Sequence, residues 1–373
     1  MTPHEDFVLS AADRIRAAAA AGTRLRIRGG GSKDFYGQTL VGDILDTTAL
    51  NGVISYEPSE LVVTALAGTP LAELEALLLA QGQCFPFEPP HLSPGATVGG
   101  MVAAGLSGPA RASAGAVRDY MLGVKLINGK GEHLTFGGQV MKNVAGYDVS
   151  RLMAGAMGTL GLLTEVSLKV LPIAPLEATL KFEMTQAEAL RQLNTWGGQP
   201  LPLNASCWVD EKLNNAGVGT LYLRLRGAVA AVEAACAKLG GERLAQAQAS
   251  ADWQRCRDQQ LQWFTARTDS QDLWRLSVPQ TAPVLDLPDS PLIEWHGGQR
   301  WVRADATHGQ RLRELATAVG GHATLFIAAS ANKSSAVAVF DVLKPPLEKI
   351  HRELKREFDP AGVFNANRLY AAW

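Results

Sequence analysis

The chain has 373 residues, of which 47% are hydrophobic and 19% are charged, and its formal net charge is −1. This length is enough for two or three domains with a sizeable core, and the balanced charge excludes the clustered cations that a nucleic-acid partner requires. No apolar run of about eighteen residues predicts a membrane-spanning helix. The first twenty residues contain acids and arginines, unlike the uncharged core of a secretory signal.

The cysteines are Cys84, Cys207, Cys236 and Cys256, and none of them are closely spaced. This spacing does not fit an iron–sulfur cluster or a structural zinc site, so no metal site is predicted. The pattern indicates reduced thiols in a cytoplasmic protein. Any electrons that leave this chain through iron–sulfur clusters therefore need a partner that holds them.

A strand is predicted over 24–28, and three glycines and Ser32 follow it directly. Glycine allows positive φ and lets neighbouring peptide N–H groups point into one concavity that holds anionic oxygens. The stretch therefore fits a cradle for a diphosphate, although three glycines alone favour a flexible surface turn. Its spacing matches neither the P-loop nor the Gly-x-Gly-x-x-Gly dinucleotide fingerprint.

The next elements continue the alternation of strands and turns. A strand is predicted over 61–68, a helix over 69–82 with Thr69 as its N-cap, a hairpin over 120–136, and a strand over 162–172.

Two further glycine clusters occupy 95–115 and 155–161. Their small residues allow the close approach of something flat and large. Three clusters within one half of the chain are hard to explain as independent surface turns, whereas one extended ligand that contacts main chain along its length explains all three.

After Pro175 the pattern becomes strand, helix, strand, strand, helix, which predicts a separate antiparallel α+β domain with its helices on one face of the sheet. The strands are expected over 178–184, 204–211 and 220–227, and the helices over 187–198 and 228–241. Five tryptophans are predicted to fill this second core or a subunit interface, namely Trp196, Trp208, Trp253, Trp263 and Trp274.

The last segment, 344–373, predicts a charged amphipathic helix that ends at Asp359-Pro360. Its charges are mixed rather than basic, which favours a solvated helix over one that lies on a membrane surface.

The glycine-rich segments 28–33, 93–132 and 141–172 resemble the flavin domain of the vanillyl-alcohol oxidase and p-cresol methylhydroxylase superfamily, and the ending "FDPAGVFNANRLY" is similar to that family's return to the flavin domain. Within it, the chain looks most like the E-subunit family of bacterial glycolate oxidases. The resemblance implies an α+β fold with a two-part, PCMH-type FAD-binding domain and a smaller antiparallel cap. We expect the FAD domain over 1–175, the cap over 176–335 and the returning segment over 336–373.

The resemblance also implies FAD rather than NAD, and it assigns the loops. Arg28, Gly29, Gly30, Gly31 and Ser32 would bind the pyrophosphate. Ser93, Pro94, Gly95, Ala96, Thr97, Gly99 and Gly100 would line the ribityl chain and flavin. Ser107, Gly108, Val117 and Asp119 would pack near the flavin and adenosine, and Gly161 and Leu162 would close the adenine side. Ser32 and Lys33 stand where some relatives tether the flavin through a histidine, so non-covalent FAD is expected.

The reaction implied by the resemblance is oxidation of a small 2-hydroxy acid, glycolate to glyoxylate. It needs a base near the hydroxyl group and a cation near the carboxylate. Relatives carry a histidine-rich cluster late in the chain, which this sequence lacks. The catalytic residues are therefore unknown, and the candidates are Arg275, Arg303 and His322, each of which is also explained by an ordinary structural role.

The resulting interpretation is an FAD-binding subunit of a glycolate oxidase complex that relays electrons or supports assembly. Its expected partners are a larger catalytic flavoprotein and an iron–sulfur subunit, and its expected location is the cytoplasm, at the inner membrane through the complex. Two alternatives stay open: an autonomous flavin-dependent D-2-hydroxy acid dehydrogenase, and a flavin-free structural subunit.

Overall fold

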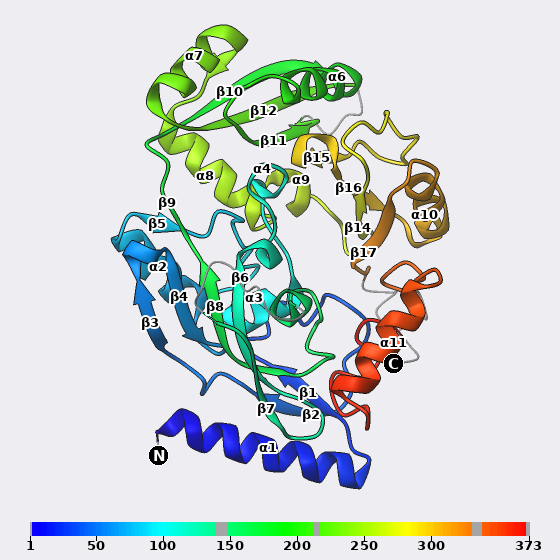
Figure 1. The fold of residues 1–373 in the computed structure, drawn as a ribbon. Helices are drawn as coiled ribbons and strands as arrows, with labels where there is room; N and C mark the ends of the chain where they lie inside the picture. Colours follow the sequence, from blue (N-terminus) through cyan, green and yellow to red (C-terminus); the bar gives the residue numbers. More distant parts are fainter. Residues whose placement is uncertain (1, 139–147, 212–216, 330–337, 371–373) are drawn as a thin grey trace. The chain divides into compact units, whose positions relative to one another are not determined.

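The computed structural model describes residues 2–138, 148–211, 217–329 and 338–370 (Figure 1). The chain forms two compact units. Unit 1 comprises Met1–Ser107, Ala116–Ile173 and Val342–Trp373, and unit 2 comprises Gly108–Gly115 and Ala174–Asp341. The sequence places its domain boundaries at 175/176 and 335/336, whereas the compact units change over at 173/174 and 341/342. Residues 141–147, which belong to a segment that carries the family resemblance, lie outside the described residues.

Unit 1 is built on a five-stranded antiparallel sheet with the strand order β3-β4-β8-β6-β7. These strands are β3 (Val53–Glu57), β4 (Val62–Leu66), β6 (Met121–Ile127), β7 (His133–Gly137) and β8 (Leu162–Lys169). β6 and β7 form the predicted hairpin. Val63, Leu126 and Val166 belong to the large core of this unit, together with buried residues of two helices, α2 and α3.

The remaining elements of unit 1 surround this sheet. They are α1 (Pro3–Ala21), β1 (Leu25–Arg28), β2 (Asp43–Asp46), η1 (Pro58–Glu60), α2 (Leu71–Ala80), β5 (Gln83–Cys84), α3 (Val98–Ala104), η2 (Val117–Tyr120), α5 (Val149–Leu152), β9 (Leu171–Pro172) and α11 (Leu347–Phe358). β1 pairs in parallel with β2. The C-terminal segment lies along β1, because the N–H of Leu25 donates to the carbonyl of Val363 and the N–H of Asn365 donates to the carbonyl of Leu25.

The caps of α3 and α2 show how local residues set the ends of helices in unit 1. α3 forms despite two internal glycines, because Thr97 caps its first turn by accepting from the N–H of Gly100, and Gly105 ends it at φ 65°. The predicted N-cap of α2 was wrong. The cap is Pro70, and the hydroxyl of Thr69 donates to the carbonyl of Gly52 instead.

Unit 2 holds an eight-stranded sheet with the order β13-β10-β12-β11-β15-β16-β14-β17, and every pairing in it is antiparallel. Its strands are β10 (Leu176–Thr185), β11 (Leu203–Val209), β12 (Val218–Gly227), β13 (Glu242–Arg243), β14 (Asp272–Ser277), β15 (Leu292–Glu294), β16 (Gln299–Ala304) and β17 (His322–Ile327). Its helices are α4 (Arg111–Ala114), α6 (Gln186–Gly197), α7 (Val229–Leu239), α8 (Gln246–Arg257), α9 (Gln262–Thr265), η3 (Trp295–Gly297), η4 (Ala306–His308) and α10 (Gly309–Ala318).

The two helices predicted for this unit, α6 and α7, lie on one face of the sheet, whereas α8, which was not predicted, lies against the other face. Leu221 and Leu223 of β12 share a core with residues of α6 and α7. The alternate residue Arg224 points the other way, and its guanidinium lies 4.8 Å from the ring centroid of Trp253 in α8. The sequence pattern of α8 did not reveal this contact, because only three of its residues are buried.

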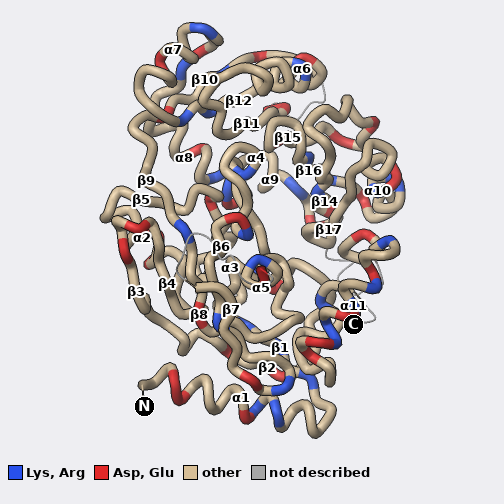
Figure 2. Tube along the Cα trace, viewed as in Figure 1, with Lys and Arg blue, Asp and Glu red and all other residues tan. Residues whose placement is uncertain are grey.

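The tryptophans fill unit 2 as predicted. Trp208, Trp253, Trp263 and Trp274 are buried, and Trp196 packs partly exposed against the core that contains Leu221. The C-terminal helix also matches its prediction, since α11 carries both acidic and basic residues along its length (Figure 2).

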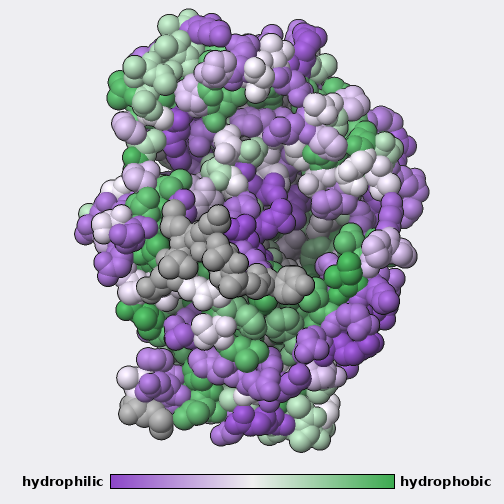
Figure 3. Space-filling model, viewed as in Figure 1, coloured by the Kyte–Doolittle hydropathy of each residue, from purple (hydrophilic) through white to green (hydrophobic). Residues whose placement is uncertain are grey.

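The start of α11 exposes apolar side chains. Val342, Leu347 and Ile350 are exposed, and Figure 3 shows hydrophobic surface in this region. Among the described residues, no helix combines the length and the apolar character that a membrane crossing would need.

Candidate functional site

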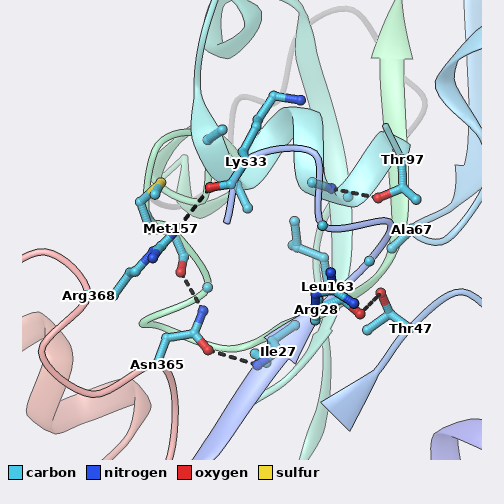
Figure 4. Close-up of a pocket in the computed structure, with 18 of the residues that line it drawn as sticks. Ile27, Arg28, Lys33, Thr47, Ala67, Thr97, Met157, Leu163, Asn365 and Arg368 are labelled. Atoms are coloured by element: carbon cyan, nitrogen blue, oxygen red, sulfur yellow. Dashed lines mark hydrogen bonds between the residues drawn. The ribbon is translucent and has the colours of Figure 1, made fainter. Parts of the chain in front are cut away.

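A cavity in unit 1 lies directly over the glycine loop that follows β1 (Figure 4). It encloses about 880 Å³ of space free of atoms, part of which is open solvent. Separate stretches of chain supply its walls. The lining residues are Ile27–Asp34, Leu40 and Thr47, then Ala67, Thr97, Gly99, Gly100, Ala103 and Ala104, then Met153, Ala156, Met157, Gly158, Leu160, Gly161 and Leu163, and finally Asn365 and Arg368.

The glycines of the first loop are required by contacts between backbones. A Cβ atom on Gly30 would lie 1.5 Å from the carbonyl oxygen of Gly95, and one on Gly29 would lie 2.4 Å from Oγ1 of Thr97. Gly31 has φ 72°, which side chains rarely adopt. The loop 28–32 therefore packs main chain to main chain against the loop 93–97, and this close approach exposes peptide groups to the cavity.

The second glycine cluster is placed by α3. Gly99 and Gly100 line the cavity from the first turn of this helix, and a Cβ atom on Gly99 would meet Cβ of Ala67 at 2.8 Å. The third cluster contributes Gly158, where φ is 71°, and Gly161. All three clusters thus meet at one cavity, which is the arrangement that a single extended ligand requires.

The C-terminal segment joins these loops, and its residues were not singled out by the sequence. Asn365 accepts from the N–H of Ile27 at 2.8 Å and donates through Nδ2 to the carbonyl of Met157 at 2.6 Å (Figure 4). Arg368 donates to the carbonyls of Lys33 and Gln38, both at 2.9 Å. The side chain of Asn365 therefore links β1, the strand before the first glycine loop, to the third glycine cluster.

A buried ion pair holds this segment in place. Nζ of Lys355 donates to Oδ2 of Asp359 at 2.5 Å and to the carbonyls of Thr159 at 2.7 Å and Phe364 at 3.0 Å. Asp359 also accepts from the N–H groups of Val363 and Phe364. Burial lowers the pKa of Lys355, and the adjacent Asp359 carboxylate opposes that shift.

Cations predominate among the charged residues that line the cavity. They are Arg28, Lys33 and Arg368, against one carboxylate, Asp34, which pairs with Arg28 at 2.7 Å. Burial lowers the pKa of Arg368 to about 10, so this guanidinium stays charged at neutral pH. A concave main-chain surface with excess positive charge fits a group that carries phosphate anions.

The cavity brings together only part of the predicted binding set. Arg28 through Ser32, Thr97, Gly99, Gly100 and Gly161 line it. Gly95 contacts Gly30 from behind, while Ser93, Pro94 and Ala96 belong to the same loop without lining the cavity.

The other predicted binding residues have different surroundings. Ser107 Oγ accepts from the N–H of Val117, and Asp119 accepts from the N–H of Ala116. Leu162 is buried in a core beside α1, and its neighbour Leu163 lines the cavity instead. Gly108 belongs to unit 2, where its carbonyl accepts from Nε1 of Trp295 at 3.0 Å.

The three catalytic candidates lie in unit 2. Arg303 is largely buried, pairs with Asp289 at 2.7 Å and stacks 4.7 Å from the ring centroid of Trp263. Arg275 lies 5.8 Å from the ring centroid of Phe326. His322 is exposed at the start of β17. Arg303 is thus engaged in packing contacts that a structural role explains.

Comparison with known proteins adds three findings. Residues 9–137 match the family described as FAD binding domain. The chain is 43% identical over 366 residues to the glycolate oxidase subunit GlcE of Escherichia coli K12, which covers 98% of both chains. It is 29% identical over 131 residues to the glycolate oxidase subunit GlcD of Bacillus subtilis 168, which covers 35% of this chain and 28% of that one.

Solved structures support the fold. An alkyldihydroxyacetonephosphate synthase matches with a TM-score of 0.65 at 15% identity, covering 95% of this chain and 74% of that one. The predicted α+β fold with a PCMH-type FAD-binding domain is confirmed, and so is the prediction of FAD as the cofactor. With 43% identity along almost its entire length, the chain belongs to the family of the glycolate oxidase subunit GlcE and contains an FAD-binding domain.

Proposed function

We propose that this chain is the FAD-binding subunit of a complex that oxidises glycolate to glyoxylate. The observation that carries the proposal is the meeting of three glycine clusters and the C-terminal Asn365 and Arg368 around one cavity. A cavity lined in large part by main chain, with excess positive charge, suits an extended dinucleotide better than it suits a small polar metabolite.

The residues that would hold FAD follow from the lining. The peptide N–H groups of 28–32, with the charges of Lys33 and Arg368, would bind the pyrophosphate. Gly99 and Gly100 would allow flat rings to approach α3 closely. FAD supplies the capacity to accept a hydride from the substrate carbon. Among the residues that the structure describes, the lining includes no histidine or cysteine, which supports non-covalent binding.

The complex supplies the route by which electrons leave. The cysteines of this chain are free thiols spread over both units, so an iron–sulfur subunit would carry electrons onward. The similarity to GlcD supports a larger flavoprotein as a second partner. In this arrangement the chain relays electrons or supports assembly in a cytoplasmic complex at the inner membrane.

A visible absorption spectrum of the purified full chain tests the cofactor. We expect flavin absorbance, or its recovery after FAD is added, and release of free flavin on acid precipitation. A protein that stays colourless after incubation with FAD would refute the proposal, and flavin that stays with the precipitate would refute non-covalent binding. Anaerobic addition of glycolate then separates the roles, because prompt bleaching would show that this chain oxidises substrate without its partners.

A further inference from the structure

Three consecutive residues at the end of β15 take the left-handed backbone conformation. Trp295 has φ 54°, His296 has φ 56° and Gly297 has φ 98°. In this region the Cβ atom crowds a neighbouring carbonyl oxygen, so glycine or asparagine is favoured and a bulky residue is strained. Two aromatic residues in succession at such φ values mark a site where the side chains matter more than local backbone energy.

The surrounding structure of unit 2 holds this turn firmly. The N–H of His296 donates to Oγ of the buried Ser206 at 2.9 Å, and Nε1 of Trp295 donates to the carbonyl of Gly108 at 3.0 Å. The carbonyl of Trp295 accepts from Nε2 of Gln280 at 3.1 Å. The turn is therefore held by contacts from three separate segments.

The turn presents a neutral histidine to an exposed hydroxyl group. Nε2 of His296 lies 3.0 Å from Oγ of Ser113 in α4, and Ser113 is exposed. Nδ1 has no hydrogen-bond partner within the described part of the chain. Burial lowers the pKa of His296 to about 4, so the ring is uncharged at neutral pH and Nε2 can accept a hydrogen bond from the Ser113 hydroxyl.

A cation reaches the same turn from α4. The guanidinium of Arg111 lies 4.5 Å from the ring centroid of Trp295, and Arg111 is two residues before Ser113. Unit 2 thus places an arginine and a serine–histidine pair against one strained turn. These are the two chemical groups that recognition of a 2-hydroxy acid needs, a partner for the carboxylate and an acceptor for the hydroxyl hydrogen.

We propose that Arg111, Ser113 and His296 form a binding site for a small 2-hydroxy acid, with the carboxylate on Arg111 and the hydroxyl group donating to the Ser113–His296 pair. The proposal rests on the proposed function of the chain.

A purely structural role explains this cluster less well. The hydroxyl of Ser113 is exposed, and Nδ1 of His296 contributes no hydrogen bond within the described residues. An asparagine at position 296 would satisfy the left-handed backbone with less strain and would keep the N–H bond to Ser206. The imidazole is therefore better explained by its hydrogen bond to Ser113, which would orient that hydroxyl group towards a ligand.

Ligand-observed NMR titration of the purified full chain tests the site. Glycolate and acetate are compared under anaerobic conditions with excess dithionite, so that no turnover interferes. We expect glycolate to bind about tenfold more tightly than acetate, which is the contribution of one hydrogen bond to a polar group. His296→Asn, which suits the backbone, and Ser113→Ala, which is exposed, should each reduce that preference to less than about threefold.

Two further variants sharpen the result. Arg111→Gln should weaken the binding of both glycolate and acetate by about tenfold or more, because it removes the partner of the carboxylate. The ratio of the two affinities should stay unchanged. His308→Asn, at a partly exposed histidine of the same unit, serves as the matched control and should change neither the two affinities nor their ratio. Absence of saturable glycolate binding, or an unchanged preference in both His296→Asn and Ser113→Ala, would overturn the inference. Failure of the same preparation to take up FAD would instead overturn the proposed function.

Discussion

Replacing Gly30 by alanine is the most direct test of the cavity. The added Cβ atom would lie 1.5 Å from the carbonyl oxygen of Gly95, about half of the closest distance that real Cβ atoms show, so the loops must separate by at least about 1.5 Å. Both contacting groups are backbone, and no side-chain rotation can relieve the overlap. Overpacking of this kind costs roughly 1–3 kcal/mol.

The same movement would weaken cofactor binding. A hydrogen bond to a charged group is worth roughly 1.5–3 kcal/mol and does not survive a displacement of 1.5 Å, so FAD affinity should fall between about tenfold and hundredfold. Fluorescence titration of the flavin-free chain with FAD measures the affinity, and urea unfolding without FAD measures the stability. Gly197→Ala, where a Cβ atom meets nothing within 4 Å, is the control. Affinity within twofold of the parent chain in Gly30→Ala would refute the reasoning.

Three further predictions concern the segments that support the cavity and the strained turn. Lys355→Met leaves the Asp359 carboxylate buried without its cation and should lower the free energy of unfolding, measured in urea, by roughly 3–5 kcal/mol. The double variant Lys355→Met with Asp359→Asn should regain part of that free energy. Asn365→Asp removes the donor to the carbonyl of Met157 and adds a negative charge at the cavity, so FAD affinity should fall at least about tenfold in the same fluorescence titration. His296 has a pKa of about 4 in the folded chain, against an ordinary value of 6.5. Between these pH values the unfolded chain binds a proton that the folded chain does not bind. The contribution of this residue to stability is therefore present above pH 6.5 and is lost as the pH falls towards 4. The parent chain should therefore lose up to about 3 kcal/mol more than His296→Asn between these pH values, and parallel unfolding curves would count against the buried neutral ring.

Local patterns in the sequence were sufficient for the parts of the site that depend on backbone conformation. The missing side chains at Gly29 to Gly31 indicated a loop that needs positive φ and close approach, and Gly31 has φ 72°. The capping Thr97 and the terminating Gly105 of α3 are local signals of the same kind, although no helix was predicted there. Such signals lie within a few residues of each other, so they can be seen without knowing the fold.

Residues that act across the fold were not accessible to the same reasoning. Asn365 bonds Ile27 across 338 positions, and no spacing in the sequence predicts that contact. The sequence assigned Leu162 to the binding site, whereas in the structure Leu162 is buried in a core and Leu163 lines the cavity. Neighbouring side chains of β8 point to opposite faces of the sheet, so a shift of one residue decides which of the two faces the cavity. The turn at His296 was missed because its strain arises from contacts with α4 and β11.

The contact between Gly30 and Gly95 changes how the first glycine cluster of this chain is interpreted. The sequence alone suggests that the side chains are absent to make room for a ligand. In the structure, the carbonyl of Gly95 fills the position that a Gly30 side chain would need, so the first requirement is the packing of one loop on another. Because that packing must exist before any cofactor arrives, Gly30→Ala should destabilise the chain without FAD as well as with it. A glycine that served the ligand alone would leave the flavin-free chain unaffected, and comparison of the two unfolding curves distinguishes these cases.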